Sequence, residues 1–169
     1  MMLKTVGLVL VVLFCSFCGV TMAASLKKRT ETLKKTLLFL HLLSERLSYT
    51  LCPVEELFEA LAAEPLLEEL DYIPDCRRRM AERLPFPEAF RESIRDSRLP
   101  LTERDRETLC SLCPIIGASS MENQLQGLAL VKANLSGQVE EAQAQADKRS
   151  RLYASLGVLS GAALAVVLL

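Results

Sequence analysis

Hydrophobic residues gather in two uncharged segments, one near each end of the chain. The first runs from Val6 to Ala24 and the second from Leu152 to Leu169. At about 1.5 Å per residue, each would form a helix of roughly 27–28 Å, close to the thickness of the hydrocarbon core of a bilayer. The pattern predicts an N-terminal transmembrane helix over 5–24, a C-terminal transmembrane helix over 152–169, and a polar domain over 25–151.

Basic residues lie on the inner flank of each apolar segment, at 27–29 after the first and at 148, 149 and 151 before the second. The positive-inside rule then places the domain 25–151 in the cytoplasm and makes the chain a multi-pass membrane protein. The alternative is a cleavable signal peptide, with Thr21-Met22-Ala23 as its cleavage site. That reading would export the domain and leave the second basic flank on the wrong side of the membrane.

Small residues recur every four positions in the second apolar segment, at Gly157, Gly161 and Ala165. Such spacing produces a flat helix face that lets another helix approach closely in lipid. The pattern predicts transmembrane helix packing here. Glycine and alanine are also common in membrane helices that pack against nothing specific, which is the plainer interpretation.

Between the apolar segments, the chain has the periodicity of helices. An amphipathic helix is predicted over 25–51 and ends at Cys52-Pro53, because proline disfavours helical geometry in the residue before it. Further prolines divide the chain into short segments, and Thr102 with Asp105 resembles a capping box that opens a helix ending near Cys113-Pro114. The apolar positions of the first helix are Leu26, Leu33, Leu37, Leu40, Leu47 and Leu51.

A second capping box, Ser119 with Glu122, predicts a helix that runs from about Ser120 into the second apolar segment. Gly127 and Gly137 weaken this helix without breaking it. No segment alternates polar and apolar residues with period two, so the fold class is an all-α helical bundle. The apolar positions of this last helix are Leu125, Leu128, Val131, Leu135, Val139, Ala142 and Ala146.

Composition argues against several classes of function. The 169 residues include 20 basic and 21 acidic side chains, whereas a nucleic-acid-binding protein usually has a basic excess. His41 is the single histidine, so no site with two histidine ligands can form. No glycine occurs between Val20 and Ile116, which leaves no phosphate-binding glycine loop there. We expect no enzymatic activity, no metal site and no cofactor.

Cys110 and Cys113 form a CxxC motif, which raises the possibility of redox or metal chemistry. The pair is predicted at the end of its helix, where the helix dipole disfavours a thiolate. Zinc would need Cys52 and Cys76 as further ligands. Neither of them has a second cysteine close to it in the sequence, whereas structural zinc sites usually combine two such pairs. The favoured interpretation is buried thiols. The alternative function is a membrane-anchored, cysteine-based metal or redox sensor.

Acidic residues dominate from Pro53 to Asp75, where no basic residue occurs, and four arginines follow at 77–79 and 83. An acidic face repelled by anionic lipid would be available to a basic partner. The alternative is an ordinary solvated face whose acids compensate the nearby arginines. The candidate partner surface comprises Glu55, Glu56, Glu59, Glu68, Glu69 and Asp71.

Four short motifs carry a resemblance to a known family. They are the run from Tyr153 to Gly161; Glu45 and Tyr49 with Pro53; Leu101-Thr102 through Asp105; and Gly117-Ala-Ser119 with Gln124. Together with the two predicted anchors, they resemble the stage III sporulation protein AB family. The chain departs from the family pattern at Ser120, at Phe90 and at Cys113-Pro114.

The resemblance implies a fold similar to the cytoplasmic domains of type II secretion F and pilus platform proteins. It also implies a place in the mother-cell membrane, in the channel apparatus between mother cell and forespore. The implied partners are the other membrane subunits and a cytoplasmic secretion-type ATPase. We therefore expect a non-enzymatic membrane platform, which binds the lipid bilayer and no nucleic acid.

Overall fold

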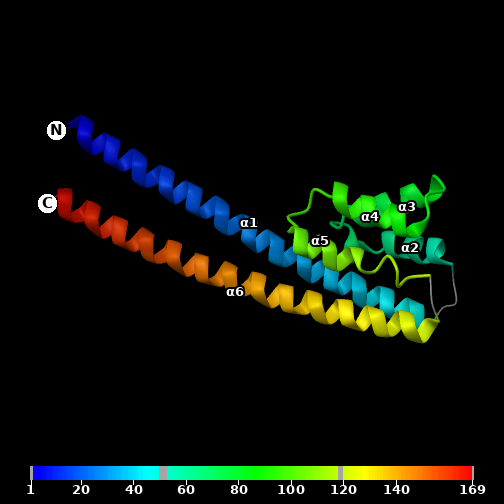
Figure 1. Ribbon diagram of the computed structural model, residues 1–169. Coiled ribbons are helices and arrows are strands. Elements are labelled where there is room, and N and C mark those ends of the chain that lie inside the picture. The colour runs from blue at the N-terminus through cyan, green and yellow to red at the C-terminus, as the bar shows by residue number, and fades with distance from the viewer. Residues whose placement is uncertain (1, 50–52, 118–119, 169) are drawn as a thin grey trace. The chain divides into compact units, whose positions relative to one another are not determined.

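A computed structural model describes residues 2–49, 53–117 and 120–168, with side chains described for 24–49, 53–117, 120–149 and 152. The chain divides into two compact units (Figure 1). One unit comprises Met1–Thr30 with Glu141–Leu169, and the other comprises Glu31–Glu140. The second unit, called here the helical domain, contains most of the described side chains.

Every regular element in the described ranges is helical, which confirms the all-α prediction there. In chain order, the long helices α1 and α6 come first and last, and four short helices lie between them. The elements are α1 (Met2–Tyr49), α2 (Val54–Ala62), a 3-10 turn (Pro65–Leu67), α3 (Tyr72–Ala81), α4 (Phe86–Asp96), α5 (Glu103–Cys110) and α6 (Met121–Leu168).

Within the part of the chain whose side chains are described, no helix has both the length and the apolar character needed to cross a membrane. The side chains of the predicted anchors 5–24 and 152–169 lie outside the described residues, apart from Ala24 and Leu152. The predicted transmembrane helices and the Gly157-Gly161 packing face therefore stay predictions.

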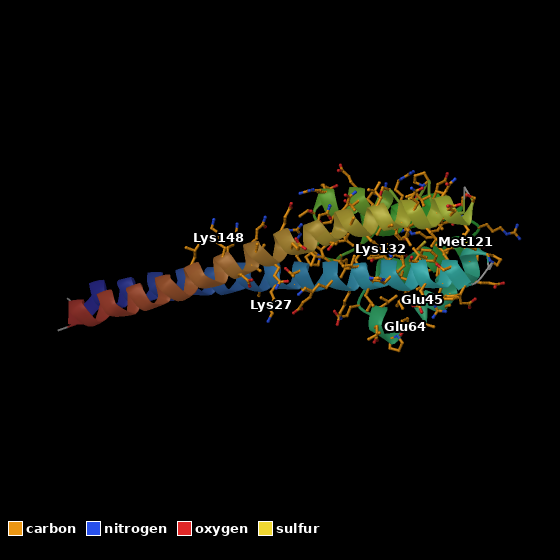
Figure 2. The ribbon with its side chains drawn as sticks, turned by 90° about the horizontal axis from the view of Figure 1, so that it is seen from below. Lys27, Glu45, Glu64, Met121, Lys132 and Lys148 are labelled. Carbon is orange, nitrogen blue, oxygen red and sulfur yellow. The ribbon has the colours of Figure 1, made fainter. Side chains whose placement is uncertain are left out.

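Within the helical domain, residues 31–49 of α1 and 121–140 of α6 lie side by side in both views (Figures 1 and 2). The inner face of α1 carries Leu33 and Leu40 as predicted, but also Phe39 and Leu43, which the predicted stripe omitted; all four are fully buried. Leu26, Leu37 and Leu47 are only half-buried, and Leu51 lies outside the described residues.

An aromatic cluster forms the centre of this domain. The ring of Phe39 lies 6.1 Å from that of Phe58, 6.0 Å from Tyr72 and 6.5 Å from Phe90, measured between centroids. Phe86 completes the group at 5.1 Å from Phe58 and 5.5 Å from Phe90. Helices α1 to α4 thus converge on one point, where aromatic rings bury large areas in edge-to-face and stacked pairs.

The buried face of α6 follows the predicted positions at Leu128, Val131, Leu135, Val139 and Ala142, whereas Leu125 and Ala146 are half-buried. Gly127 is needed for packing, because a Cβ there would lie 2.9 Å from a side-chain carbon of Ile115. Glycine at this position lets α6 approach the α5–α6 connection closely.

Helix ends agree with the sequence signals in part. Thr102 and Asp105 form the predicted reciprocal capping box of α5. The helix ends at Cys110, three residues before Cys113, because the chain enters a series of turns that Gly117 closes at φ 80°. Ser119 of the second predicted box lies outside the described residues.

Arg83 adopts a left-handed backbone conformation, with φ 69°, just after α3. The amide of Leu84 donates to the carbonyl of Arg79 at 3.1 Å, so this turn satisfies carbonyls at the helix C-terminus. Glycine usually fills such a position, and a side chain there costs about 1–2 kcal/mol.

Arg83→Gly should therefore raise the free energy of unfolding by about 0.5–1 kcal/mol, since the relieved strain exceeds the added entropy of the unfolded chain. Urea denaturation measures this change. Arg83→Ala is the matched control, because it removes the same charge but keeps the Cβ; an equal gain in both variants would show that strain is not the cause.

Candidate functional site

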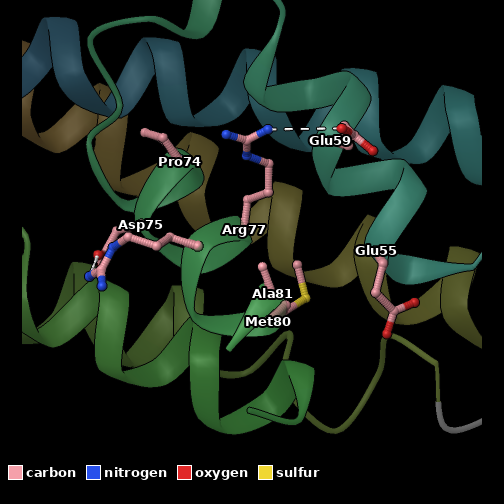
Figure 3. A pocket seen from close by; sticks show the side chains of 8 residues that line it. Glu55, Glu59, Pro74, Asp75, Arg77, Met80 and Ala81 are labelled. Atoms are coloured by element: carbon pink, nitrogen blue, oxygen red, sulfur yellow. Dashed lines mark hydrogen bonds and ion pairs between the residues drawn. The ribbon is translucent and has the colours of Figure 1, made fainter. Parts of the chain in front are cut away.

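A groove of about 720 Å³ lies between α2 and α3 (Figure 3). Helix α2 contributes Glu55 and Glu59 to one wall. Helix α3 contributes an apolar floor of Pro74, Met80 and Ala81 and a wall that carries Arg77, Arg78 and Asp75. The groove thus combines apolar surface with charges of opposite sign on its two sides.

Amphipathic folding of both helices produces this arrangement. Helix α2 buries Leu57, Phe58 and Leu61, which leaves its glutamates on the opposite, solvent-facing side. Helix α3 buries Tyr72, Ile73, Cys76 and Met80 and turns Arg77 and Arg78 outward. Glu55 and Glu56 also lie in the first turn of α2, where the helix dipole favours negative charge.

The two walls are only weakly connected by charge. Arg77 Nη1 lies 3.9 Å from Glu59 Oε1, with both side chains more than half exposed (Figure 3). Arg78 instead pairs along its own helix, with Asp75 and, at 3.1 Å, with Glu82. No ion pair of Glu55 or Glu56 is found among the described side chains, and both are exposed. This end of α2 therefore presents uncompensated negative charge.

The remaining acids of the predicted partner surface have different surroundings. Glu69 pairs with Lys35 at 2.5 Å. Asp71 accepts hydrogen bonds from Ser97 Oγ at 2.6 Å and from the Arg98 amide at 2.9 Å, which joins α3 to the segment after α4. Glu68 is exposed. The predicted surface thus contains two groups of acids. Some have intramolecular partners, and the others are exposed without an ion pair among the described side chains.

Arg79 is the centre of an ion-pair network that the sequence did not reveal. Its guanidinium donates to Asp75 Oδ2 at 2.8 Å, to Asp96 Oδ2 at 2.7 Å and to Glu92. Hydrogen bonding to Asp75 raises the pKa of Arg79, with burial opposing. Burial acts to raise the pKa of Asp75, but hydrogen bonds from Arg78 and Arg79 outweigh it and lower that pKa below its ordinary value. The network ties α3 to α4.

The lowered pKa of Asp75 predicts an acid-sensitive contribution to stability. Because the folded state favours the ionised carboxylate, this contribution is complete above the ordinary pKa of 3.8 and is lost as pH falls through the lower, folded-state value. Asp75→Asn should therefore reduce the stability difference between pH 7 and pH 3. Chemical denaturation at both pH values measures it; an unchanged difference would contradict this role.

The cysteines are placed as follows. Of the CxxC pair, Cys113 is buried as predicted, whereas Cys110, the last residue of α5, is only half-buried. Cys76 of α3 is also buried. Cys52, Cys15 and Cys18 lie outside the described side chains. No group of three or more histidine, cysteine or acidic side chains within the described residues could hold a metal ion.

The helix dipole is only a small influence on the thiol of Cys110. A dipole effect of about 0.3–1 kcal/mol corresponds to less than one pKa unit. A hydrogen bond with Cys113 lowers the pKa of Cys110 to about 7, aided by Arg91 and Arg106 and opposed by burial and Glu107. Hydrogen bonding to Cys110 and burial raise the pKa of Cys113.

The other sequence-predicted positions lie on the surface of α1 or at helix ends and turns. His41, Glu45 and Tyr49 are exposed on α1. Pro53 is the N-cap of α2, and the Gly117 amide donates to Gln124 Oε1 at 3.4 Å. The side chain of Tyr153 lies outside the described residues.

Two contacts between distant segments, one of them buried, had no signal in the sequence pattern. Tyr72 donates to Thr36 Oγ1 at 3.2 Å, which joins α3 to α1 inside the core. Arg106 donates to the carbonyls of Ile94, Arg95 and Ser97, which would otherwise be unsatisfied at the end of α4. Both contacts join segments that are distant in the sequence.

Comparison with known proteins gives one result. The model of a protein family described as stage III sporulation protein AB matches residues 4–169. No curated protein and no solved structure matches the chain significantly. The family match includes both apolar segments and the whole helical domain between them, and it agrees with the resemblance carried by the four sequence motifs. The chain belongs to the stage III sporulation protein AB family.

Proposed function

We propose that this protein is a non-enzymatic platform subunit of the channel apparatus between mother cell and forespore. It is anchored in the mother-cell membrane by 5–24 and 152–169. Its helical domain lies in the cytoplasm and docks a secretion-type ATPase and other membrane subunits. Family membership, which implies a role in sporulation, supports the first part of this proposal.

The observation that carries the docking role is the groove between α2 and α3. It offers an apolar floor beside Glu55 and Glu56, which are exposed and not paired with any described basic side chain. Charges at the rim of an interface mainly steer a partner and fix its register, while the apolar surface contributes binding energy. A partner with a basic, partly apolar segment fits this surface.

Support for the membrane anchors comes from the sequence alone. The segments Val6–Ala24 and Leu152–Leu169 carry no charge, and basic residues flank both on the side of the helical domain. A helix that spans a bilayer needs about 20 apolar residues, which is close to the length of each segment. In the structure, α1 and α6 each include one of these segments and part of the helical domain.

A pull-down from sporulating cells tests the docking role. The full-length chain, tagged and solubilised in detergent, should recover a secretion-type ATPase together with other stage III membrane subunits. Recovery of the membrane subunits without any ATPase would contradict the docking role. An equal recovery of ATPase with an unrelated tagged membrane protein would show that the association is non-specific.

Replacing the small residues of the second anchor should impair assembly. In the double variant Gly157→Leu with Gly161→Leu, bulky side chains would prevent close helix approach in lipid. We expect reduced recovery of membrane partners and an unchanged thermal unfolding of the helical domain. Leu156→Ala with Leu164→Ala is the control in the same segment. Normal recovery of partners by the glycine variant would remove these residues from the packing face.

A further inference from the structure

The turn after α5 brings Cys110 and Cys113 together. The Cys113 amide donates to the Cys110 carbonyl at 3.1 Å. A hydrogen-bonded turn of this kind holds its end Cα atoms within about 7 Å, and a disulfide spans Cα separations of about 4.4–6.8 Å. Cys113 is also the largest cause that lowers the pKa of Cys110, as expected for two neighbouring thiols. A disulfide could therefore form with little change in the backbone.

The two thiols differ in access. Cys113 is 1% exposed, whereas Cys110 is half-buried and can be reached from solvent. Cys113 contributes to the wall of a separate hollow of about 480 Å³, which Arg91 and Phe86 also line. One thiol is therefore accessible, and the other lies behind it within bonding reach.

Charged groups around Cys110 favour its thiolate on balance. Arg91 of α4 and Arg106 of α5 are the nearby cations, and Glu107 of α5 opposes them. Cys76 of α3 lies near Cys113, and its own pKa is raised to about 12, mainly by burial. Cys76 therefore stays a neutral thiol at physiological pH. A thiolate is the nucleophile in thiol–disulfide exchange, and cationic surroundings favour it.

We propose that Cys110 and Cys113 form a reversible dithiol–disulfide pair, with Cys110 as the attacking thiol and Cys113 as the resolving thiol. The co-reactant is a low-molecular-weight disulfide. The Cys110 thiolate attacks one of its sulfurs, which forms a mixed disulfide and releases one thiolate. Cys113 then loses its proton and attacks the Cys110 sulfur, which closes the protein disulfide and releases the second thiolate. The protein loses two electrons, and the co-reactant becomes two thiols.

Disulfide mapping on the full-length chain in detergent micelles tests this proposal. The reduced protein is equilibrated with mixtures of reduced and oxidised glutathione, blocked with iodoacetamide and digested with trypsin. The peptide 107–132 contains both cysteines. Under oxidising mixtures it should lose two hydrogens and resist alkylation, and dithiothreitol should restore it. A peptide that stays fully alkylatable in every mixture, or a Cys76–Cys113 link, would overturn the pair.

Single variants separate the two roles. Cys113→Ser should accumulate glutathione on Cys110, because no second thiol resolves the mixed disulfide. Cys110→Ser should leave Cys113 almost unmodified, and Cys76→Ser should form the internal disulfide normally. Preferential modification of Cys113 in the Cys110→Ser variant would overturn the assignment of roles.

The pH dependence of alkylation gives an independent readout. In the wild-type chain, the alkylation rate of Cys110 should be half-maximal near pH 7, in line with the lowered pKa of that thiol, which is about 7. Cys113→Ala leaves no hydrogen-bond donor at this position, so it removes the largest cause of that lowering and should shift the midpoint upward, with about a tenfold smaller thiolate fraction at pH 7. An unchanged midpoint would show that Cys113 does not activate Cys110.

Discussion

Phe39→Ala is expected to lower the free energy of unfolding of the helical domain by about 3–5 kcal/mol. Phe39 is fully buried, and its ring contacts Phe58, Tyr72 and Phe90, which come from three other helices. Removing the ring would leave a cavity at the one point where these helices converge. Because small domains are stable by only about 5–15 kcal/mol, this loss would remove a large fraction of the stability of the domain.

Urea denaturation followed by circular dichroism measures the effect. Leu130→Ala is the matched control, because Leu130 is 65% exposed on α6 and its truncation should change stability by about 0.5 kcal/mol or less. If both variants unfolded at the same urea concentration, the aromatic cluster would not be the main source of stability.

Reversing three acids of α2, of which Glu55 and Glu59 line the groove, is expected to reduce recovery of the ATPase about tenfold or more. In the triple variant Glu55→Lys, Glu56→Lys and Glu59→Lys, attraction to a basic partner becomes repulsion. Like charges facing each other across an interface cost several kcal/mol, and about 1.4 kcal/mol already corresponds to a tenfold change. Quantitative pull-down from sporulating cells measures this loss.

The control for this variant is Glu122→Lys with Glu140→Lys, both on the exposed side of α6. Glu122 lies in the first turn of its helix, as Glu55 and Glu56 do, so both variants lose a favourable helix-dipole interaction. Thermal unfolding checks that both remain folded. An equal loss of ATPase in the control and the groove variant would place the docking surface elsewhere.

Helices were predictable because their signals are local. Pro53 sets the start of α2, and Thr102 with Asp105 caps α5, each within a few residues of the helix it defines. The inner face of α1 was predicted less well, because a leucine count missed Phe39 and Leu43. Which face of a helix is buried depends on partners such as Tyr72 and Phe90, and these come from distant parts of the chain.

The charged surface was predictable in composition but not in pairing. Spacing alone could not show that Glu69 meets Lys35, or that Asp71 binds the segment after α4. Such contacts depend on how α3 packs against α1 and α4. The exposed acids that remain, above all Glu55 and Glu56, are the part of the predicted surface that the structure leaves available.

For the pair Cys110 and Cys113 too, the sequence predicted the local position but not the contacts with distant segments. The position of Cys110 at a helix end was predicted from sequence, and the structure agrees. Its electrostatic surroundings were not predictable, because Arg91 belongs to α4 and reaches this turn only after the helices pack.

The proposed platform function requires that the membrane-anchored helical domain lies in the cytoplasm. Cys76 cannot report that placement, because it is fully buried. Glu68→Cys introduces a thiol at an exposed position of the helical domain. Its labelling by a membrane-impermeant maleimide, compared with the wild-type chain, reports which side of the membrane the domain occupies. We predict that the chain sediments with membranes and that residue 68 reacts only after permeabilisation; labelling in intact cells, or a chain that stays in the supernatant, would contradict the account.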